Sequence, residues 1–159
     1  MATNINRGKA FEIKVKEDLL KIPDIDVERL PDQMTGFKGT SKNVSDFEVY
    51  LYPNLYFIEC KTTHENTFPL SGLSQYDKLL EKKGKKGVRS GVVLWFIKHD
   101  KVVYVPIATF EKLKTDGKKS VNIKMLEAED YRIIIIPSVK KRVFMDSDYS
   151  ILKSLQEGD

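Results

Sequence analysis

The most regular pattern of apolar and polar residues lies near the N-terminus of the chain. Phe11, Val15 and Leu19 recur at every fourth position, with charged residues between them. Apolar side chains with this spacing gather on one face of an α-helix. The pattern predicts an amphipathic helix over residues 6–20, whose apolar face packs against the rest of the protein.

Two β-strands joined by a tight turn are predicted in the middle of the chain. Residues 46–51 and 55–61 are rich in aromatic and aliphatic side chains, and Pro53 lies in the turn between them. Runs of this kind, bounded by turn residues, are typical of strands. The turn would fold the two strands back on each other as hairpin partners.

The remaining elements alternate between strand and helix patterns. In chain order they are a helix over 73–84, strands over 91–97 and 101–107, a short helix over 109–113, a strand over 131–136 and a short helix over 150–155. Together with the first helix and the hairpin, this order favours an α/β protein. We expect a central mixed β-sheet flanked by helices.

Composition indicates a small protein with one domain over residues 1–159. The chain is 41% hydrophobic, which is enough for a real core at this length. No apolar run approaches the roughly 20 residues that cross a bilayer, and the first residues lack a hydrophobic signal region. We therefore expect a cytoplasmic protein with no membrane partner. One cysteine excludes an internal disulfide, and two histidines disfavour a Cys/His zinc site.

The predicted hairpin carries a group of residues with candidate chemistry. Asp46 begins the first strand, and Glu59 and Lys61 share one face of the second, with Cys60 pointing to the other. Mg²⁺ prefers oxygen ligands, and Asp46, Glu59 and the backbone carbonyl of Cys60 would supply them. The metal would polarise a phosphodiester and acidify water, and Lys61 would stabilise developing charge. The alternative is a surface Glu-Lys pair with Asp46 at a turn.

A third acid, Glu12, flanks the apolar stripe of the predicted N-terminal helix. From there it would point along the boundary between helix and sheet and not straight into solvent. The alternative is an ordinary surface pair with Lys16, one helical turn away. Spacing alone leaves both interpretations open.

Basic residues fall in three clusters, although the net charge is only +4. The clusters are Lys82, Lys83, Lys85, Lys86 and Arg89; Lys38 and Lys42; and Lys140, Lys141 and Arg142. Loop lysines that contact phosphates would give DNA binding with strong salt dependence and little sequence preference. The alternative is that they only keep the surface soluble.

Four short segments of the chain resemble the PD-(D/E)XK nuclease superfamily. They are Arg7-Gly8, Phe11-Glu12, Ser45-Asp46 and Glu59-Cys60-Lys61. Within the superfamily, the chain is similar to Holliday junction resolvases of the archaeal type and of the RecU-like type. The likeness to the RecU-like type includes residues 59–63, residues 68–70 and Gln75. It spans residues 4–112, and a C-terminal strand and helix follow over 131–156.

The resemblance implies a PD-(D/E)XK nuclease core and a role for each matching residue. Asp46 and Glu59 would be metal ligands, and Lys61 would be the catalytic lysine. Glu12 would be the helix-borne acid, which could reach the metal through a water. Gln75 would be the polar residue of the helix that follows the strand.

Two features depart from the family pattern. Ser45 replaces the proline that usually precedes the aspartate, a change that spares the acid. Residues 27–44 are too few for the long stalk of RecU-like enzymes, so the compact archaeal-type layout is the better guide. In that type a loop serine matters for junction cutting, and Ser41 is its counterpart here. The alternative is an ordinary loop hydroxyl.

The function that the resemblance implies is a Mg²⁺-dependent endodeoxyribonuclease, for which Mn²⁺ substitutes and no small-molecule cofactor is needed. Such a crossover junction endodeoxyribonuclease resolves four-way DNA junctions by paired symmetric nicks. The residues expected to contact the branched DNA are Arg7, Lys38, Ser41, Lys42, Lys82, Lys83, Lys85, Lys86 and Arg89. The alternatives are a restriction- or repair-type endonuclease and a non-catalytic basic DNA-binding module.

A homodimer is expected because a four-way junction is close to two-fold symmetric and each chain would carry one active site. Two chains related by a matching two-fold axis would place one nick on each of two opposing strands. The dimer surface needs exposed apolar residues. The strand around residues 102–105 and the tail around residues 143–145 are the two candidates.

Overall fold

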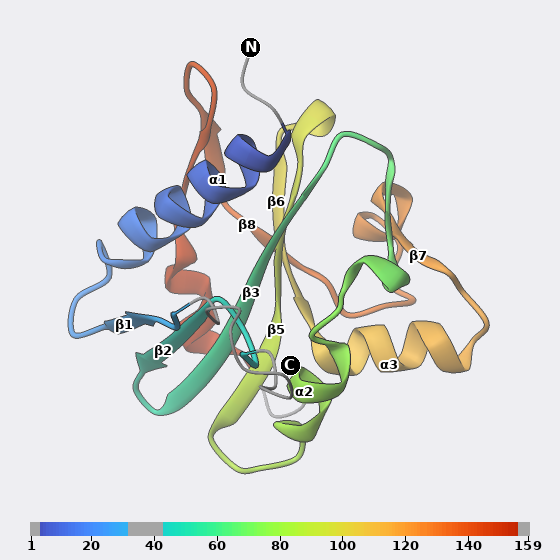
Figure 1. Ribbon diagram of the computed structural model, residues 1–159, viewed down its shortest axis with the longest axis horizontal. Helices are drawn as coiled ribbons and strands as arrows, with labels where there is room; N and C mark the ends of the chain where they lie inside the picture. The colour runs from blue at the N-terminus through green and yellow to red at the C-terminus, as the bar shows by residue number, and fades with distance from the viewer. Residues whose placement is uncertain (1–3, 32–42, 156–159) are drawn as a thin grey trace, which may run out of the picture.

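The computed structural model describes residues 4–31 and 43–155, and a mixed β-sheet lies at its centre (Figure 1). Its strands follow the spatial order β1-β2-β3-β5-β6-β8. Their bounds are β1 Asp26–Arg29, β2 Phe47–Leu51, β3 Asn54–Thr63, β5 Val88–Phe96, β6 Lys101–Pro106 and β8 Ile134–Ile136. β3 and β5 run parallel, and the other neighbouring pairs run antiparallel. The predicted α/β class with a central mixed sheet is confirmed.

The predicted hairpin is formed by β2 and β3, but its two strands differ in length. β2 has five residues and β3 has ten. β2 pairs with the first half of β3, from Leu51 opposite Asn54 to Phe47 opposite Ile58. β5 pairs with β3 over nearly its whole length. Among the described residues, the second half of β3 therefore has a ladder partner on only one edge, and we call its other edge the open edge.

The predicted N-terminal helix is α1, Asn4–Leu19, which covers one face of the sheet. Its apolar stripe is buried as expected, with Phe11 4% exposed and Val15 and Leu19 fully buried. The Phe11 ring stacks on Trp95 of β5 at 5.4 Å between centroids. Each such buried side chain contributes about 1.5–3 kcal/mol, so the stripe fixes α1 and every polar residue that it carries.

The opposite face of the sheet is covered by α2, Tyr76–Glu81, and α3, Ile107–Thr115, which lie to the right of the sheet in Figure 1. A short sheet of β4, Thr67–Pro69, and β7, Ser120–Asn122, extends this layer. The 3₁₀ turns η1, Leu70–Gly72, and η3, Ile123–Leu126, follow these strands. The helix predicted over residues 73–84 is shorter in the structure, because the residues before Tyr76 form a turn.

The C-terminal part of the chain forms a hairpin and a 3₁₀ helix on the α1 side. β9, Ser138–Lys140, pairs with β10, Met145–Ser147, and η4 follows at Tyr149–Ser154. The predicted terminal helix is therefore present in 3₁₀ form. Among the residues that the structure describes, no helix has both the length and the apolar composition that a membrane crossing requires.

The prediction that the strand around residues 102–105 forms the dimer contact is wrong. β6 lies between β5 and β8 in the sheet, and helices or turns cover both of its faces. Its residues Val102, Val103 and Val105 are at most 1% exposed. These apolar side chains form the core, so they cannot contact a second chain.

Candidate active site

Asp46 and Glu59 come together where β2 begins. Asp46 directly precedes β2, and the register that pairs Phe47 with Ile58 places Asp46 opposite Glu59. Asp46 also bonds to the next residue of β3, because its Oδ2 accepts a hydrogen bond of 2.8 Å from the backbone N–H of Cys60. Two acids that are distant in sequence are thus fixed side by side by the hairpin.

The open edge of β3 faces Asp46. In a strand, the N–H and C=O of one residue point to the same edge, as they do when a pair exchanges both hydrogen bonds. Since the Cys60 N–H points to Asp46, the Cys60 carbonyl lies on this open edge as well. The backbone oxygen that we expected to act as a metal ligand is therefore placed beside the two carboxylates.

Lys61 and Glu59 share a face of β3, as the alternation of side chains predicted. The Lys61 Nζ lies 3.6 Å from Oε1 of Glu59, and the Lys61 side chain is 26% exposed. Cys60 points the other way, into the core beneath α1. Burial raises the pKa of the Cys60 thiol well above its ordinary value, so the sulfur stays protonated and takes no part in the site.

Burial and like charge disfavour ionisation of the two acids. The pKa of Glu59 rises to about 8, first because the side chain is buried and then because Asp46 is negative, while Lys61 acts in the opposite direction. The pKa of Asp46 is also raised, mainly by burial, and the Cys60 N–H opposes this rise. Oε2 of Glu59 is buried and has no hydrogen-bond partner in the described part of the chain.

These features fit a divalent cation. A cation between the carboxylates would neutralise their repulsion and give the unpartnered Glu59 oxygen a ligand role. Across the described ranges, no three His, Cys, Asp or Glu side chains form a complete ligand set. Mg²⁺ does not need one, because it binds through one or two carboxylates and keeps water and phosphate as its other ligands. Asp46, Glu59 and the Cys60 carbonyl are the residues that would hold it.

Glu12 reaches the site from α1. Its Oε2 accepts a hydrogen bond of 3.0 Å from Arg29, and its negative charge raises the pKa of both Asp46 and Glu59. Of the two alternatives left by the sequence, the one in which Glu12 points along the boundary between helix and sheet describes the structure. The ion pair described for Glu12 is with Arg29 rather than with Lys16.

Arg29 is a residue of the site that the sequence did not indicate. It ends β1, a four-residue strand paired with β2, and its backbone neighbour Leu30 donates a hydrogen bond to the Asp46 carbonyl. β1 is too short and too polar for a periodicity signal. The sequence indicated only that the Glu12 carboxylate needs a cation as partner. Residue spacing could not show which arginine would supply it.

Arg7, an expected DNA-contact residue, lies near the end of β3. Arg7, near the start of α1, lines a cavity of about 270 Å³ together with Thr62, Thr63, His64 and Glu65 at the end of β3. The structure thus brings Arg7 to the strand that carries Glu59 and Lys61, and its expected contact with DNA stays a prediction.

Gln75 is half-buried just before α2, on the face of the sheet that Glu59 faces. Its Oε1 accepts a hydrogen bond from the Ser74 hydroxyl. In the part of the chain that the structure describes, Gln75 has no hydrogen bond with Asp46 or Glu59. Its catalytic role stays a prediction.

The expected DNA-contact residues do not form one surface. The Lys82 Nζ lies 4.7 Å from the centre of the Phe57 ring. Phe57 precedes Glu59 by two residues and lies on the same face of β3. Lys83 pairs with Glu111 of α3, whereas Lys85 and Lys86 are exposed in the loop before β5. This loop lies at the opposite end of β3 from Thr63, because Leu55 pairs with Val88. Lys38, Ser41 and Lys42 lie outside the described residues.

Arg89 requires a correction. The sequence grouped it with the loop lysines, but it is only 7% exposed, and its Nη2 donates a hydrogen bond of 3.1 Å to the Leu155 carbonyl. Arg89 is the second residue of β5, so its side chain points into the protein instead of continuing the exposed loop. It holds the C-terminal segment in place and is not a DNA contact.

Comparison with known proteins adds no relative: no protein-family model and no curated protein sequence matches the chain. The interpretation of the site therefore depends on its own residues and their geometry.

Replacing Glu59 with glutamine should stabilise the metal-free protein. Glutamine keeps the size of the side chain but removes a buried charge beside Asp46. The folded protein holds the Glu59 proton up to about pH 8, whereas the ordinary pKa is 4.5, so the contribution of this carboxyl to stability falls as pH rises between these values. With chelator at pH 8.5, we expect a gain of about 1–3 kcal/mol, or roughly 3–8 °C in Tm.

Thermal unfolding at pH 5 and pH 8.5 measures this effect, and Glu17→Gln, an exposed change on α1, is the matched control. The gain should be smaller at pH 5, where the wild-type carboxyl is protonated. A Glu59→Gln protein that is no more stable than wild type at pH 8.5 would show that the carboxylate is already compensated in the metal-free site.

Proposed function

We propose that the protein is a metal-dependent, structure-specific endodeoxyribonuclease that resolves four-way DNA junctions. The observation that carries this proposal is the pairing of Asp46 with Glu59 beside the Lys61 ammonium, where Oε2 of Glu59 is buried and has no partner among the described residues. Neutral polar residues would fold at lower cost in these positions. A buried acid pair next to a cation is therefore better explained by chemistry on an anionic substrate than by packing.

The fold supports the same class of protein. Apart from β4, which belongs to the short second sheet, and the turn η1, the chain from α1 to β5 follows the order α-β-β-β-α-β, which is the order of the PD-(D/E)XK core that the sequence resembles. The paired acids lie where β2 and β3 separate, and the lysine lies two residues beyond the second acid. The acid of α1 completes the group, with Arg29 holding it in place.

The chain's residues divide the work of hydrolysis. When bound by Asp46, Glu59 and the Cys60 carbonyl, Mg²⁺ supplies a Lewis acid that polarises the scissile phosphate and lowers the pKa of water. The Cys60 N–H fixes the orientation of the Asp46 carboxylate through their hydrogen bond. Lys61 is exposed enough to meet a phosphate, where its ammonium orients the attacking water and stabilises the charge that develops on the phosphate oxygens.

The test is incubation of the protein with Mg²⁺ and a matched set of four-way, Y-shaped, linear and mismatched DNAs. We expect preferential cleavage of the four-way junction. Efficient cutting of a particular linear sequence or of mismatched DNA would replace the proposal with a restriction- or repair-type endonuclease. Binding without any cleavage in Mg²⁺ or Mn²⁺ would indicate a non-catalytic DNA-binding module.

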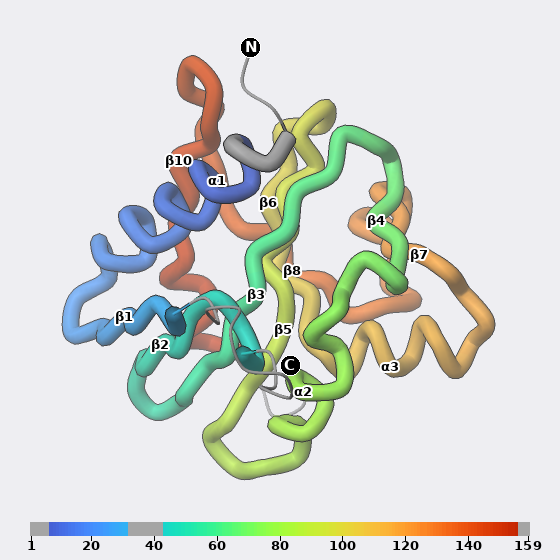
Figure 2. Tube along the Cα trace, in the orientation of Figure 1, coloured from blue at the N-terminus to red at the C-terminus, as the bar shows by residue number. Residues whose placement is uncertain are grey.

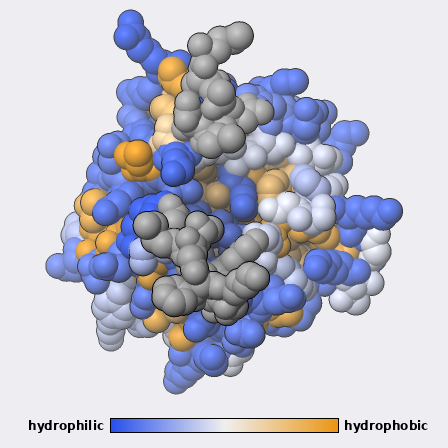
Figure 3. All heavy atoms as spheres, in the orientation of Figure 1, coloured by the Kyte–Doolittle hydropathy of each residue, from blue (hydrophilic) through white to orange (hydrophobic). Residues whose placement is uncertain are grey.

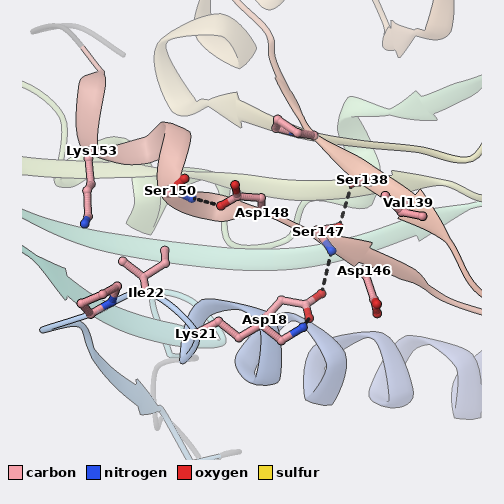
Figure 4. Close-up of a pocket in the computed structure, with 12 residues that line it drawn as sticks. Asp18, Lys21, Ile22, Ser138, Val139, Asp146, Ser147, Asp148, Ser150 and Lys153 are labelled. Atoms are coloured by element: carbon pink, nitrogen blue, oxygen red, sulfur yellow. Dashed lines mark hydrogen bonds and ion pairs between the residues drawn. The ribbon is translucent and has the colours of Figure 1, made fainter.

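Resolution by paired nicks also requires a homodimer, and we propose a contact surface for it. In the tail that the sequence suggested, Met145 is buried and Phe144 packs against Trp95, which leaves only Val143 exposed. A groove of about 510 Å³ lies between the end of α1 and β9, where Pro23, Pro137 and Val139 are set among charged and hydroxyl side chains (Figure 4). Its wall includes Val139, which is 62% exposed. We place the contact with the second chain here.

Light scattering should give twice the mass of one chain, and Val139→Asp should give the single-chain mass because a charge would enter an apolar contact. Val143→Asp is the matched control, since Val143 is similarly exposed but lies outside the groove. On the face shown in Figure 3, other apolar side chains lie in separate groups among hydrophilic ones. A monomeric wild-type protein at cleavage concentrations would contradict the dimer.

A further inference from the structure

The β9–β10 hairpin carries a run of three basic residues that the active site does not use. Lys140 ends β9, and Lys141 and Arg142 form its tip together with Val143. The turn is closed by a hydrogen bond of 2.9 Å from the Lys141 N–H to the Phe144 carbonyl. Lys141, Arg142 and Val143 are all exposed. The tip projects beside the first turns of α1 (Figures 1 and 2).

The base of this hairpin is held firmly on α1. Asp18 is buried and accepts a hydrogen bond of 3.0 Å from the Ser147 N–H, and the hydroxyls of Ser138 and Ser147 bond to each other at 2.8 Å (Figure 4). Lys14 of α1 pairs with Asp146 at 2.6 Å. A rigid base lets the tip hold its cations in fixed positions, which reduces the entropy lost when they bind a partner.

The tip belongs to a basic rim that surrounds one end of the sheet. Basic residues of the rim come from the start of α1, the turn between β5 and β6, and the hairpin: Arg7, Lys9, Lys98, Lys101, Lys140, Lys141 and Arg142. Acids at this end of the molecule are Glu65, Asp100 and Asp146, of which Asp146 pairs with Lys14 at 2.6 Å and lies 3.8 Å from Lys141. Basic side chains thus outnumber acidic ones, which makes this end of the molecule a positively charged surface.

An ion pair and a hydrogen bond connect the rim from the hairpin to the active-site strand. Lys140 pairs with Asp100 at 3.0 Å, which joins the hairpin to the β5–β6 turn. His99 of that turn bonds to Asn66 at 2.7 Å, next to the cavity that Arg7 lines with Thr62–Glu65. Thr63 is about 7 Å beyond Lys61 at about 3.3 Å per strand residue. The rim therefore begins close to Lys61, where we place the scissile phosphate.

We propose that this basic rim binds the phosphate backbone of duplex DNA flanking the scissile phosphate, with Lys141 and Arg142 at the hairpin tip as its outer contacts. The inference rests on the proposed nuclease function for its choice of DNA. Phosphates recur regularly along a duplex, so cations spread over one end of the protein can each meet one. The contacts are to the backbone and position the DNA without reading its sequence.

Binding without cleavage tests this surface. Fluorescence anisotropy in Ca²⁺ buffer would compare wild type with Lys141→Ala/Arg142→Ala on a four-way junction and on linear duplex. Lys118→Ala/Lys119→Ala is the matched control, because it removes two adjacent exposed lysines after α3, away from the rim. The hairpin variant should bind roughly 10- to 50-fold more weakly at about 0.1 M salt, and its salt slope should fall by about two.

The charge-retaining variant Lys141→Arg/Arg142→Lys should keep wild-type affinity, which separates loss of charge from loss of the hairpin. Circular dichroism checks that each variant is folded. If wild type binds and cuts junctions but the hairpin variant binds as well as the control, this inference falls and the proposed function stands. If wild type neither binds nor cuts any branched DNA, both fall.

Discussion

Replacing Asp46 or Glu59 with alanine is expected to abolish DNA cleavage while leaving junction binding largely intact. Each acid is one of the two carboxylates that would hold the metal, and its loss leaves a single carboxylate for that task. A drop of about 10³-fold or more corresponds to about 4 kcal/mol of lost transition-state stabilisation. Binding should survive because phosphate contacts come from basic residues at some distance, such as those of the rim and Lys82.

Single-turnover cleavage in Mg²⁺ and junction binding in Ca²⁺ measure the two properties separately. Asp77→Ala, an exposed change on α2, is the matched control and should cut normally. Asp46→Asn removes the charge but keeps the size of the side chain, so it should fail as completely as alanine. Full nuclease activity in the Asp46 or Glu59 variants would remove these acids from the catalytic site.

Lys61→Ala is expected to lose most turnover and to keep metal binding. Its ammonium faces Glu59 at 3.6 Å and is partly exposed, so it is placed to act on water and phosphate rather than on the cation. Removing one group that stabilises developing charge costs about 10²- to 10³-fold in rate. Metal affinity should change by no more than about threefold, the scale of a partly exposed charge pair.

Calorimetric titration with Mn²⁺ beside single-turnover cleavage decides this assignment. Lys112→Ala is the control, because Lys112 lies on α3 and contacts Tyr131 away from the site. Lys61→Met tests whether the apolar part of the side chain matters. If Lys61→Ala loses its affinity for metal but the metal-bound fraction cuts at the normal rate, Lys61 supports the metal site instead of the reaction.

The main elements around the site could be predicted because strong local patterns specify them. The four-residue spacing of Phe11, Val15 and Leu19 required a helix with one buried face, and that helix places Glu12. The turn at Pro53 required β2 and β3 to pair, which brings Asp46 to Glu59. Because side chains alternate between the two faces of β3, Lys61 and Cys60 could be assigned to opposite faces. Each of these inferences depends on residues close together in sequence.

The parts that could not be predicted depend on contacts between distant segments. β1 has four residues and forms by pairing with β2, so Arg29 gave no signal. Arg89 follows a lysine-rich loop in sequence, but the register of β5 turns it inward against Leu155. β9 and β10 are three residues each and are held by α1, through Asp18 among others. The composition of the chain could not show that the basic residues between β9 and β10 extend the positively charged surface near Lys61.

The most direct test of the proposed function is to map the nicks on a four-way junction labelled on each of two opposing strands. In Mg²⁺, wild-type protein should cut both strands at positions related by the two-fold axis of the junction. The same sequences as linear duplexes should stay intact, and a mixed dimer with one Asp46→Ala chain should nick only one strand. Equal cutting of linear duplex, or no cutting of junctions with Mg²⁺ or Mn²⁺, would contradict the assignment as a junction-resolving nuclease.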